Sequence, residues 1–60
     1  SPADTRYRMS LAQGYYMAGY KQQSLAVLEA VLAANPGHAR AAEFAARLRG
    51  EIAAETPSRP

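Results

Sequence analysis

The sequence predicts an all-α fold of three helices. Alanine, leucine, glutamate, arginine and glutamine dominate the 60 residues, whereas the strand-favouring residues valine, isoleucine and threonine are few. Large apolar residues recur at steps of three and four in three separate segments of the chain. Turn residues stand between these segments, with Gly19 after the first and Pro36 and Gly37 after the second. Together these observations favour helices joined by short turns.

The first helix is expected over residues 2–18. Ser1 is suited to the N-cap and Pro2 to the first helical position, where its missing N–H costs nothing. Gly19 supplies the left-handed residue that ends the helix. The predicted buried stripe consists of Tyr7, Leu11, Tyr15 and Ala18, with Ala12 and Gly14 as small neighbours.

The second and third helices are expected over residues 21–34 and 38–54. The second is apolar nearly all round, which predicts neighbours on two sides, and its buried stripe is Leu25, Leu28, Val31 and Leu32. The third has one apolar side, formed by Ala41, Phe44, Ala45, Leu48 and Ile52. These three helices form one predicted domain over residues 1–55. The polar, proline-rich residues 56–60 are predicted to be a disordered tail or the start of a linker.

Large and small residues recur at characteristic spacings through the first two helices and the turn that follows them: Leu11, Ala12, Tyr15, Ser24, Leu28, Val31 and Pro36. This pattern resembles the tetratricopeptide repeat, a helical hairpin of 34 residues. Leu11, Tyr15 and Pro36 are identical to the residues that the family prefers. Arg8 departs from it, because the family places a bulky residue such as tryptophan there. Tyr7 or the aliphatic stem of Arg8 is expected to fill that space.

The resemblance implies a single repeat followed by a capping helix, and a role in holding other proteins. Repeat proteins bury their faces against neighbouring repeats, so two arrangements stay open. In one, the third helix caps the hairpin as a minimal three-helix unit. In the other, the exposed side of the first helix meets a preceding repeat or a second copy of the chain.

A second set of residues on the first helix forms the candidate binding surface. In the related family these positions resemble the concave surface that receives peptides, and their composition suits adaptable contact. The set consists of Met9, Gln13, Tyr16, Met17 and Tyr20. Arg40 and Arg47, together with Arg6, are expected to flank this surface and attract an acidic segment. The alternatives are that the third helix covers the set and that the arginines are solvated helix charges.

One version of the related family clamps a C-terminal carboxylate with lysine and asparagine on the first helix. Met9 and Gln13 occupy the corresponding positions here, which argues against that ligand.

Catalysis and cofactor binding are not expected. His38 is the only histidine, cysteine is absent, and the five acids are scattered, so neither a metal site nor an acid–base pair is predicted. We expect His38 to be solvated or to cap the third helix. A hairpin of this size is also expected to lack the volume for a small-molecule pocket, which is a few hundred cubic ångströms.

The charge and hydropathy patterns exclude two further classes of partner. The formal net charge of +2 is spread along the chain without a basic block, so nucleic acid is not an expected partner. No apolar run is long enough to insert into a membrane. The sequence therefore predicts a protein-interaction module, part of a larger scaffold or assembly protein, that displays a helical surface to a peptide or partner helix. The alternative is a self-association domain with no separate ligand.

Overall fold

Three α-helices follow one another in the computed structural model, which describes residues 2–55. They are α1 (Pro2–Met17), α2 (Lys21–Ala34) and α3 (Ala39–Glu55), and the described range contains no strand. The predicted all-α fold is confirmed, with helix ends within one residue of those expected. The proposed cap at Ser1 and the proposed tail at 56–60 lie outside the described residues.

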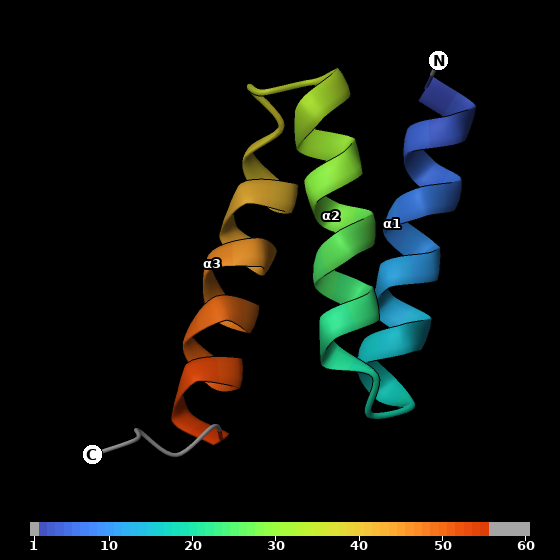
Figure 1. The fold of residues 1–60 in the computed structure, drawn as a ribbon. Helices are drawn as coiled ribbons and strands as arrows, with labels where there is room; N and C mark the ends of the chain where they lie inside the picture. Colours follow the sequence, from blue (N-terminus) through green and yellow to red (C-terminus); the bar gives the residue numbers. More distant parts are fainter. Residues whose placement is uncertain (1, 56–60) are drawn as a thin grey trace.

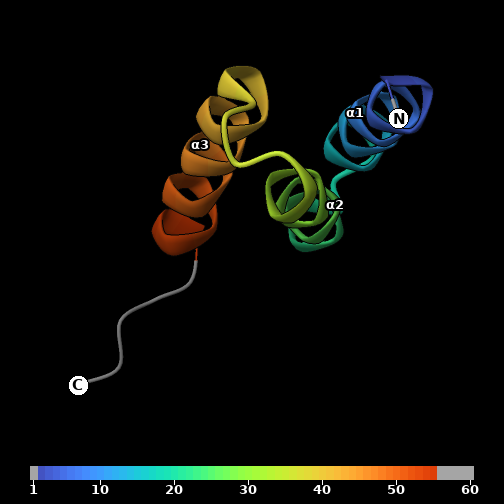
Figure 2. The ribbon, with the colours of Figure 1, turned by 90° about the horizontal axis from the view of Figure 1, so that it is seen from above.

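The middle helix, α2, organises the arrangement. Successive helices run in opposite directions, so α1 and α3 both run antiparallel to α2 (Figure 1). Viewed from above, α2 lies at the corner of an open V whose two arms are α1 and α3 (Figure 2). α2 packs against both neighbours, whereas α1 and α3 touch each other little. The prediction that α2 has neighbours on two sides is confirmed.

The turn between α1 and α2 is a Schellman motif centred on Gly19. Gly19 has a φ of +93°, in the left-handed region that favours glycine. Its N–H donates to the Tyr16 carbonyl at 3.1 Å, and the Tyr20 N–H donates to the Tyr15 carbonyl at 2.8 Å. The Tyr15 and Tyr20 rings pack edge to face, with centroids 6.4 Å apart, as the apolar contact that accompanies this motif. The glycine therefore ends α1 and sets the direction of the hairpin.

A β-turn joins α2 to α3. The His38 N–H donates to the Asn35 carbonyl at 3.1 Å, with Pro36 in the second position of the turn, where its fixed φ is favourable. His38 then caps α3, because its Nδ1 accepts a hydrogen bond of 3.1 Å from the Ala41 N–H. The expected capping role of His38 is confirmed.

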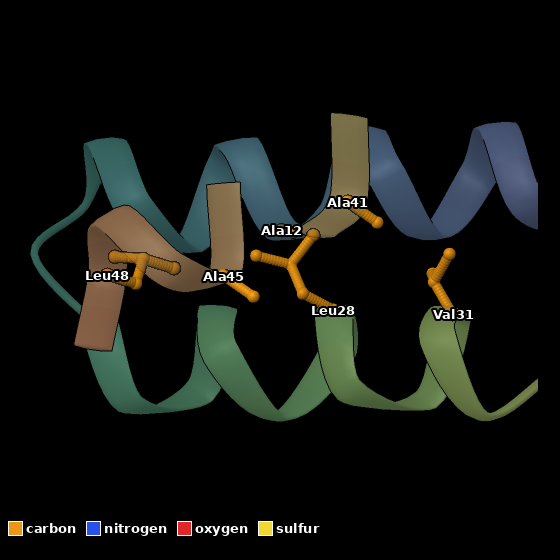
Figure 3. Close-up of a cluster of buried hydrophobic side chains, with 6 residues drawn as sticks. All are labelled: Ala12, Leu28, Val31, Ala41, Ala45 and Leu48. Carbon is orange, nitrogen blue, oxygen red and sulfur yellow. The ribbon is translucent and has the colours of Figure 1, made fainter. Parts of the chain in front are cut away.

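The core consists of large side chains from α2 and α3 packed against alanines. The fully buried apolar residues are Ala12, Leu28, Val31, Ala41, Ala45 and Leu48 (Figure 3). Leu28 extends from α2 among the alanines of both neighbours (Figure 3). Alanine at these positions lets the helix backbones approach closely. The predicted stripes of α2 and α3 are confirmed, since their remaining members are half-buried.

A buried hydrogen bond fixes the crossing of α1 and α2. The Ser24 hydroxyl, which has no exposed surface, donates to the Ala12 carbonyl at 2.7 Å. Ser24 is the one buried polar side chain in residues 2–55, and the bond satisfies it and places two small residues where the helices meet.

The predicted stripe of α1 is wrong in part. Tyr7 is 67% exposed and Ala18 is exposed, whereas Ala12, expected only as a neighbour, is fully buried. Leu11 and Tyr15 are half-buried at one edge. α1 has turned its small Ala12 toward α2 because the large Leu28 and Val31 already fill the space between the helices, and a tyrosine there would overpack it.

Replacing Leu28 by alanine should lower the free energy of unfolding by about 2 to 5 kcal/mol, because the truncation leaves a cavity between three helices. Leu32→Ala is the matched control: the same atoms are removed from a half-buried side chain, so the loss should be smaller. Thermal melts followed by circular dichroism measure both. Equal losses would show that Leu28 is not the centre of the core.

Candidate functional site

An open groove lies between α1 and α3, on the side of the molecule where these two helices diverge (Figure 2). Its volume is about 920 Å³. α1 contributes Thr5, Arg6, Met9, Ser10, Gln13 and Tyr16, and the α3 side contributes His38, Arg40, Glu43, Phe44 and Arg47. The expectation that so small a chain lacks a few hundred cubic ångströms of pocket volume is wrong, because α3 lies beside α2 and leaves an open space between itself and α1. Most of the lining residues are exposed, so the space is a groove and not a closed cavity.

The floor of the groove is apolar. Met9, Tyr16 and Phe44 are half-buried and pack against the core. The Tyr16 and Phe44 rings meet edge to face, with centroids 5.5 Å apart and an interplanar angle of 81°. This contact joins α1 to α3 directly and gives the groove an aromatic base.

The rim of the groove is polar and mainly cationic. Arg6 lies on the α1 side, and Arg40 and Arg47 lie on the α3 side, with Glu43 between them in sequence. Among the described residues, Arg6, Arg40 and Glu43 make no ion pair, whereas Arg47 contacts Glu51. The groove therefore combines an apolar base with exposed positive charge.

A polar cluster centred on Glu51 lies beside one end of the groove, where it contacts the lining residues Tyr16 and Arg47. The Tyr16 hydroxyl from α1 lies 3.2 Å from both carboxylate oxygens of Glu51 and donates to them. Lys21 Nζ from α2 lies 3.1 Å from Glu51 Oε1, and Arg47 Nε lies 3.4 Å from Oε2. Lys21 also pairs with Glu55. Glu51 thus contacts all three helices at the end where α1 and α3 finish.

These contacts shift two pKa values in opposite directions. Lys21, followed by the Tyr16 hydroxyl and Arg47, lowers the pKa of Glu51 below its ordinary value of 4.5, against the opposing effect of desolvation. Glu55 and then Glu51 raise the pKa of Lys21 above 10.5. Both shifts favour the charged forms, so the cluster is ionised around neutral pH.

The Arg47 guanidinium also lies against the aromatic floor. Its central carbon is 5.8 Å from the centroid of the Tyr16 ring, which is within cation–π range. Arg47 is therefore held by Tyr16 and Glu51, whereas Arg6 and Arg40 at the other end project without such partners among the described residues.

The structure brings together five of the seven predicted binding residues. Met9, Gln13, Tyr16, Arg40 and Arg47 line the groove. Met17 and Tyr20 do not: Met17 is 76% exposed outside it, and Tyr20 is 55% exposed beyond the end of α1. The expectation that all of the α1 residues share one side is wrong, because successive helical positions differ by about 100° and the Gly19 turn redirects the chain before Tyr20.

The alternative prediction is that α3 covers the candidate binding residues of α1. Tyr16 is the one that contacts α3 through both a hydrogen bond and a ring contact. The Tyr16 hydroxyl donates to Glu51 and its ring meets Phe44 edge to face, so Tyr16 supports the fold as well as lining the groove. Gln13 stays exposed. Tyr20 lines a smaller hollow of about 280 Å³ near the start of α2, with Lys21, Ile52 and Glu55 among its neighbours.

Sequence reasoning missed Glu51 and Lys21. Arg47 and Glu51 stand four residues apart, a spacing that indicates an ion pair on one helix face. No spacing rule links Glu51 to Lys21 or Tyr16, because these residues are about thirty positions away in the chain. They meet Glu51 only in the folded protein.

The described part of the chain contains no group of three or more histidine, cysteine, aspartate or glutamate residues placed to hold a metal ion. None of its helices combines the length and apolar character needed to cross a bilayer. Comparison of the chain with protein-family models, with curated proteins and with solved structures finds no significant match.

The Glu51 cluster predicts a stability maximum with an acid and an alkaline limb. Because the folded pKa of Glu51 is depressed, its contribution is present above pH 4.5 and is lost as the pH falls through the folded value. Because the folded pKa of Lys21 is raised, its contribution is present below pH 10.5 and is lost at higher pH.

The pH dependence of Tm in wild type and Glu51→Gln tests this assignment. The Glu51→Gln variant should lose stability at neutral pH and show a shallower acid limb. Glu43→Gln, which changes an acid with no ion pair in residues 2–55, is the control and should keep the wild-type acid limb. An unchanged acid limb in Glu51→Gln would exclude Glu51 as its source.

Proposed function

We propose that this chain is a protein-interaction module that receives a segment of a partner protein in the groove between α1 and α3. The observation that carries the proposal is the composition of the groove: a half-buried aromatic and thioether floor formed by Met9, Tyr16 and Phe44, beneath a rim of arginines. Protein interfaces have this anatomy, with an apolar centre enriched in aromatic residues, methionine and arginine, and a polar margin.

The placement of the polar residues supports recognition and not catalysis. His38 uses Nδ1 to cap α3, and Glu51 is engaged by three cationic or hydroxyl donors at the end of the groove. Arg6, Gln13 and Arg40 line the groove with long side chains whose N–H groups can donate hydrogen bonds to a ligand. The proposed module therefore binds without transforming its partner and needs no cofactor.

We include in this proposal that the chain is a unit of tetratricopeptide-repeat type. Four positions that the repeat reserves for helix packing are the fully buried positions of the α1–α2 hairpin: Ala12, Ser24, Leu28 and Val31. The groove also lies between the first helix of the hairpin and the helix that follows the hairpin. Both features support a repeat-like unit with a concave binding side.

Selection from a random peptide library tests this function. Wild type should enrich peptides that perturb the backbone amides of groove residues in two-dimensional NMR spectra. Gln13→Trp should lose them, because a large side chain at this exposed groove position fills the space without touching the core. Met17→Ala removes an exposed side chain outside the groove and should keep them. Failure of wild type to select any groove-binding peptide would refute the proposed function.

A second candidate function, self-association, is favoured by the outer side of α1. Tyr7 and Met17 are 67% and 76% exposed there. A Cβ added to Gly14 would meet nothing within 4 Å, so no contact among residues 2–55 requires a glycine at that position. A glycine within a helix costs about 0.5 to 1 kcal/mol relative to alanine. Close approach of a second copy of the chain would offset that cost.

Sedimentation equilibrium on the Gly14→Ala variant tests self-association. Alanine should stabilise the folded monomer by about 0.4 to 1 kcal/mol, because it restricts the unfolded chain. If two copies pack at Gly14, the variant should nevertheless associate more weakly than wild type. Tyr7→Ser should weaken association as well, without the gain in stability. A wild type that sediments as a monomer at all concentrations would exclude this candidate.

A further inference from the structure

We propose that the segment received by the groove is an amphipathic helix with an acidic C-terminal turn, which lies antiparallel to α1 and α3. This inference rests on the proposed function and specifies its ligand. It follows from three features of the groove: the uneven distribution of charge along it, the cost of placing Arg40 where it stands, and the hydrogen-bonding groups that its walls offer.

Charge is distributed unevenly along the groove. α1 and α3 begin at the same end (Figure 1), and Arg6 and Arg40 lie in their first two turns, without ion pairs among the described residues. At the opposite end, Lys21 and Arg47 face Glu51 and Glu55, so that cations and anions balance. Asp4 is near the first end, but it is not among the residues that line the groove. In this half of the groove the lining holds Arg6 and Arg40 against the single acid Glu43, so a net positive charge is concentrated where α1 and α3 begin.

Arg40 stands at a position that is unfavourable for the helix that carries it. It is the second residue of α3, and the first turn of that helix holds no acid. A cation near a helix N-terminus is repelled by the partial positive charge of the helix dipole. Arg40 makes no ion pair in residues 2–55, and the first acid of its own helix, Glu43, follows three residues later. If an anionic group binds beside Arg40, both the arginine and the N-terminus of α3 attract it, so the position of Arg40 becomes favourable.

The walls of the groove suit a helix better than an extended peptide. An extended peptide leaves its backbone N–H and C=O groups to be satisfied by the site, whereas a helix satisfies its own. The walls are themselves helices, whose interior backbone groups are already bonded, and Gln13 is the only side-chain amide among the lining residues. A fourth helix between α1 and α3 would instead pack its apolar side chains on Met9, Tyr16 and Phe44, as helices pack in bundles.

The charge distribution also sets the direction of that helix. The C-terminal end of a helix carries partial negative charge, so it is attracted to the end of the groove that holds Arg6 and Arg40. Acidic side chains in the same turn add to this attraction. Glu43, one turn further along α3, repels acids placed near the middle of the ligand and confines them to its end. A ligand with its C-terminus at this end runs antiparallel to α1 and α3.

Fluorescence anisotropy with a synthetic peptide tests the inference. The probe is an amphipathic peptide of about 15 residues, about 22 Å long as a helix, with leucines at steps of three and four and glutamates in its last turn. Each exposed ion pair contributes a few-fold in affinity, so the double variant Arg6→Gln/Arg40→Gln should bind about tenfold more weakly than wild type. Arg8→Gln changes the same charge on α1 outside the groove and should bind as wild type does.

A nitroxide on the C-terminus of the peptide reports the direction. It should broaden the amide resonances of residues near Arg6 and Arg40 and leave those near Gly19 and Glu55 sharp. Broadening at the Gly19 end, or equal weakening by Arg8→Gln and the double variant, would overturn the inference. A Tm of the double variant at or above that of wild type shows that weaker binding does not reflect unfolding. If this peptide fails to bind while library-selected peptides occupy the groove, the inference fails and the proposed function stands; if neither binds, both fail.

Discussion

The packing of Leu28 against small residues on both sides is the constraint on which the rest of the structure depends. Leu28 has no exposed surface and lies among Ala12 of α1 and Ala41 and Ala45 of α3. Because the neighbours are alanines, one leucine-bearing helix can hold two others closely. α1 and α3 are therefore held mainly by α2. They meet each other through Tyr16, which contacts Phe44 and Glu51, and elsewhere the space between them remains as a groove. The candidate site is a direct consequence of where the small residues are.

At one end of the groove the lining side chains also stabilise the fold, whereas at the other end they do not. Tyr16 and Arg47 line the groove, yet they also join the Glu51 cluster that ties the three helices together. Arg6 and Arg40 have no such role among the described residues. A ligand that reaches the Glu51 cluster must compete with contacts that stabilise the protein, whereas a ligand held by Arg6 and Arg40 gains new contacts without loss of old ones. Recognition is therefore expected to centre on the end of the groove that the fold leaves uncommitted.

Helix positions were predictable because the signals that set them are local. Gly19 ends α1 through its positive φ, and the Pro36 turn separates α2 from α3, so neither depends on distant residues. The buried stripes of α2 and α3 were predictable as well, since α2 is apolar on nearly all sides and α3 has one clear apolar side. The polar cluster was not, because Lys21 and Tyr16 reach Glu51 only after three helices have packed.

The sequence by itself determined the all-α class, the ends of the helices and the central place of α2. Only the tertiary structure decided which side of α1 is buried and, with it, the composition of the groove. The physical reason is that α1 carries large apolar residues around most of its circumference, with Tyr7, Met9, Leu11, Tyr16 and Met17 pointing in different directions. Hydrophobic periodicity therefore cannot predict which side of α1 is buried. Packing against α2 decides it: close helix contact requires a small side chain at the crossing, so Ala12 is buried there and Tyr7 and Met17 remain in solvent.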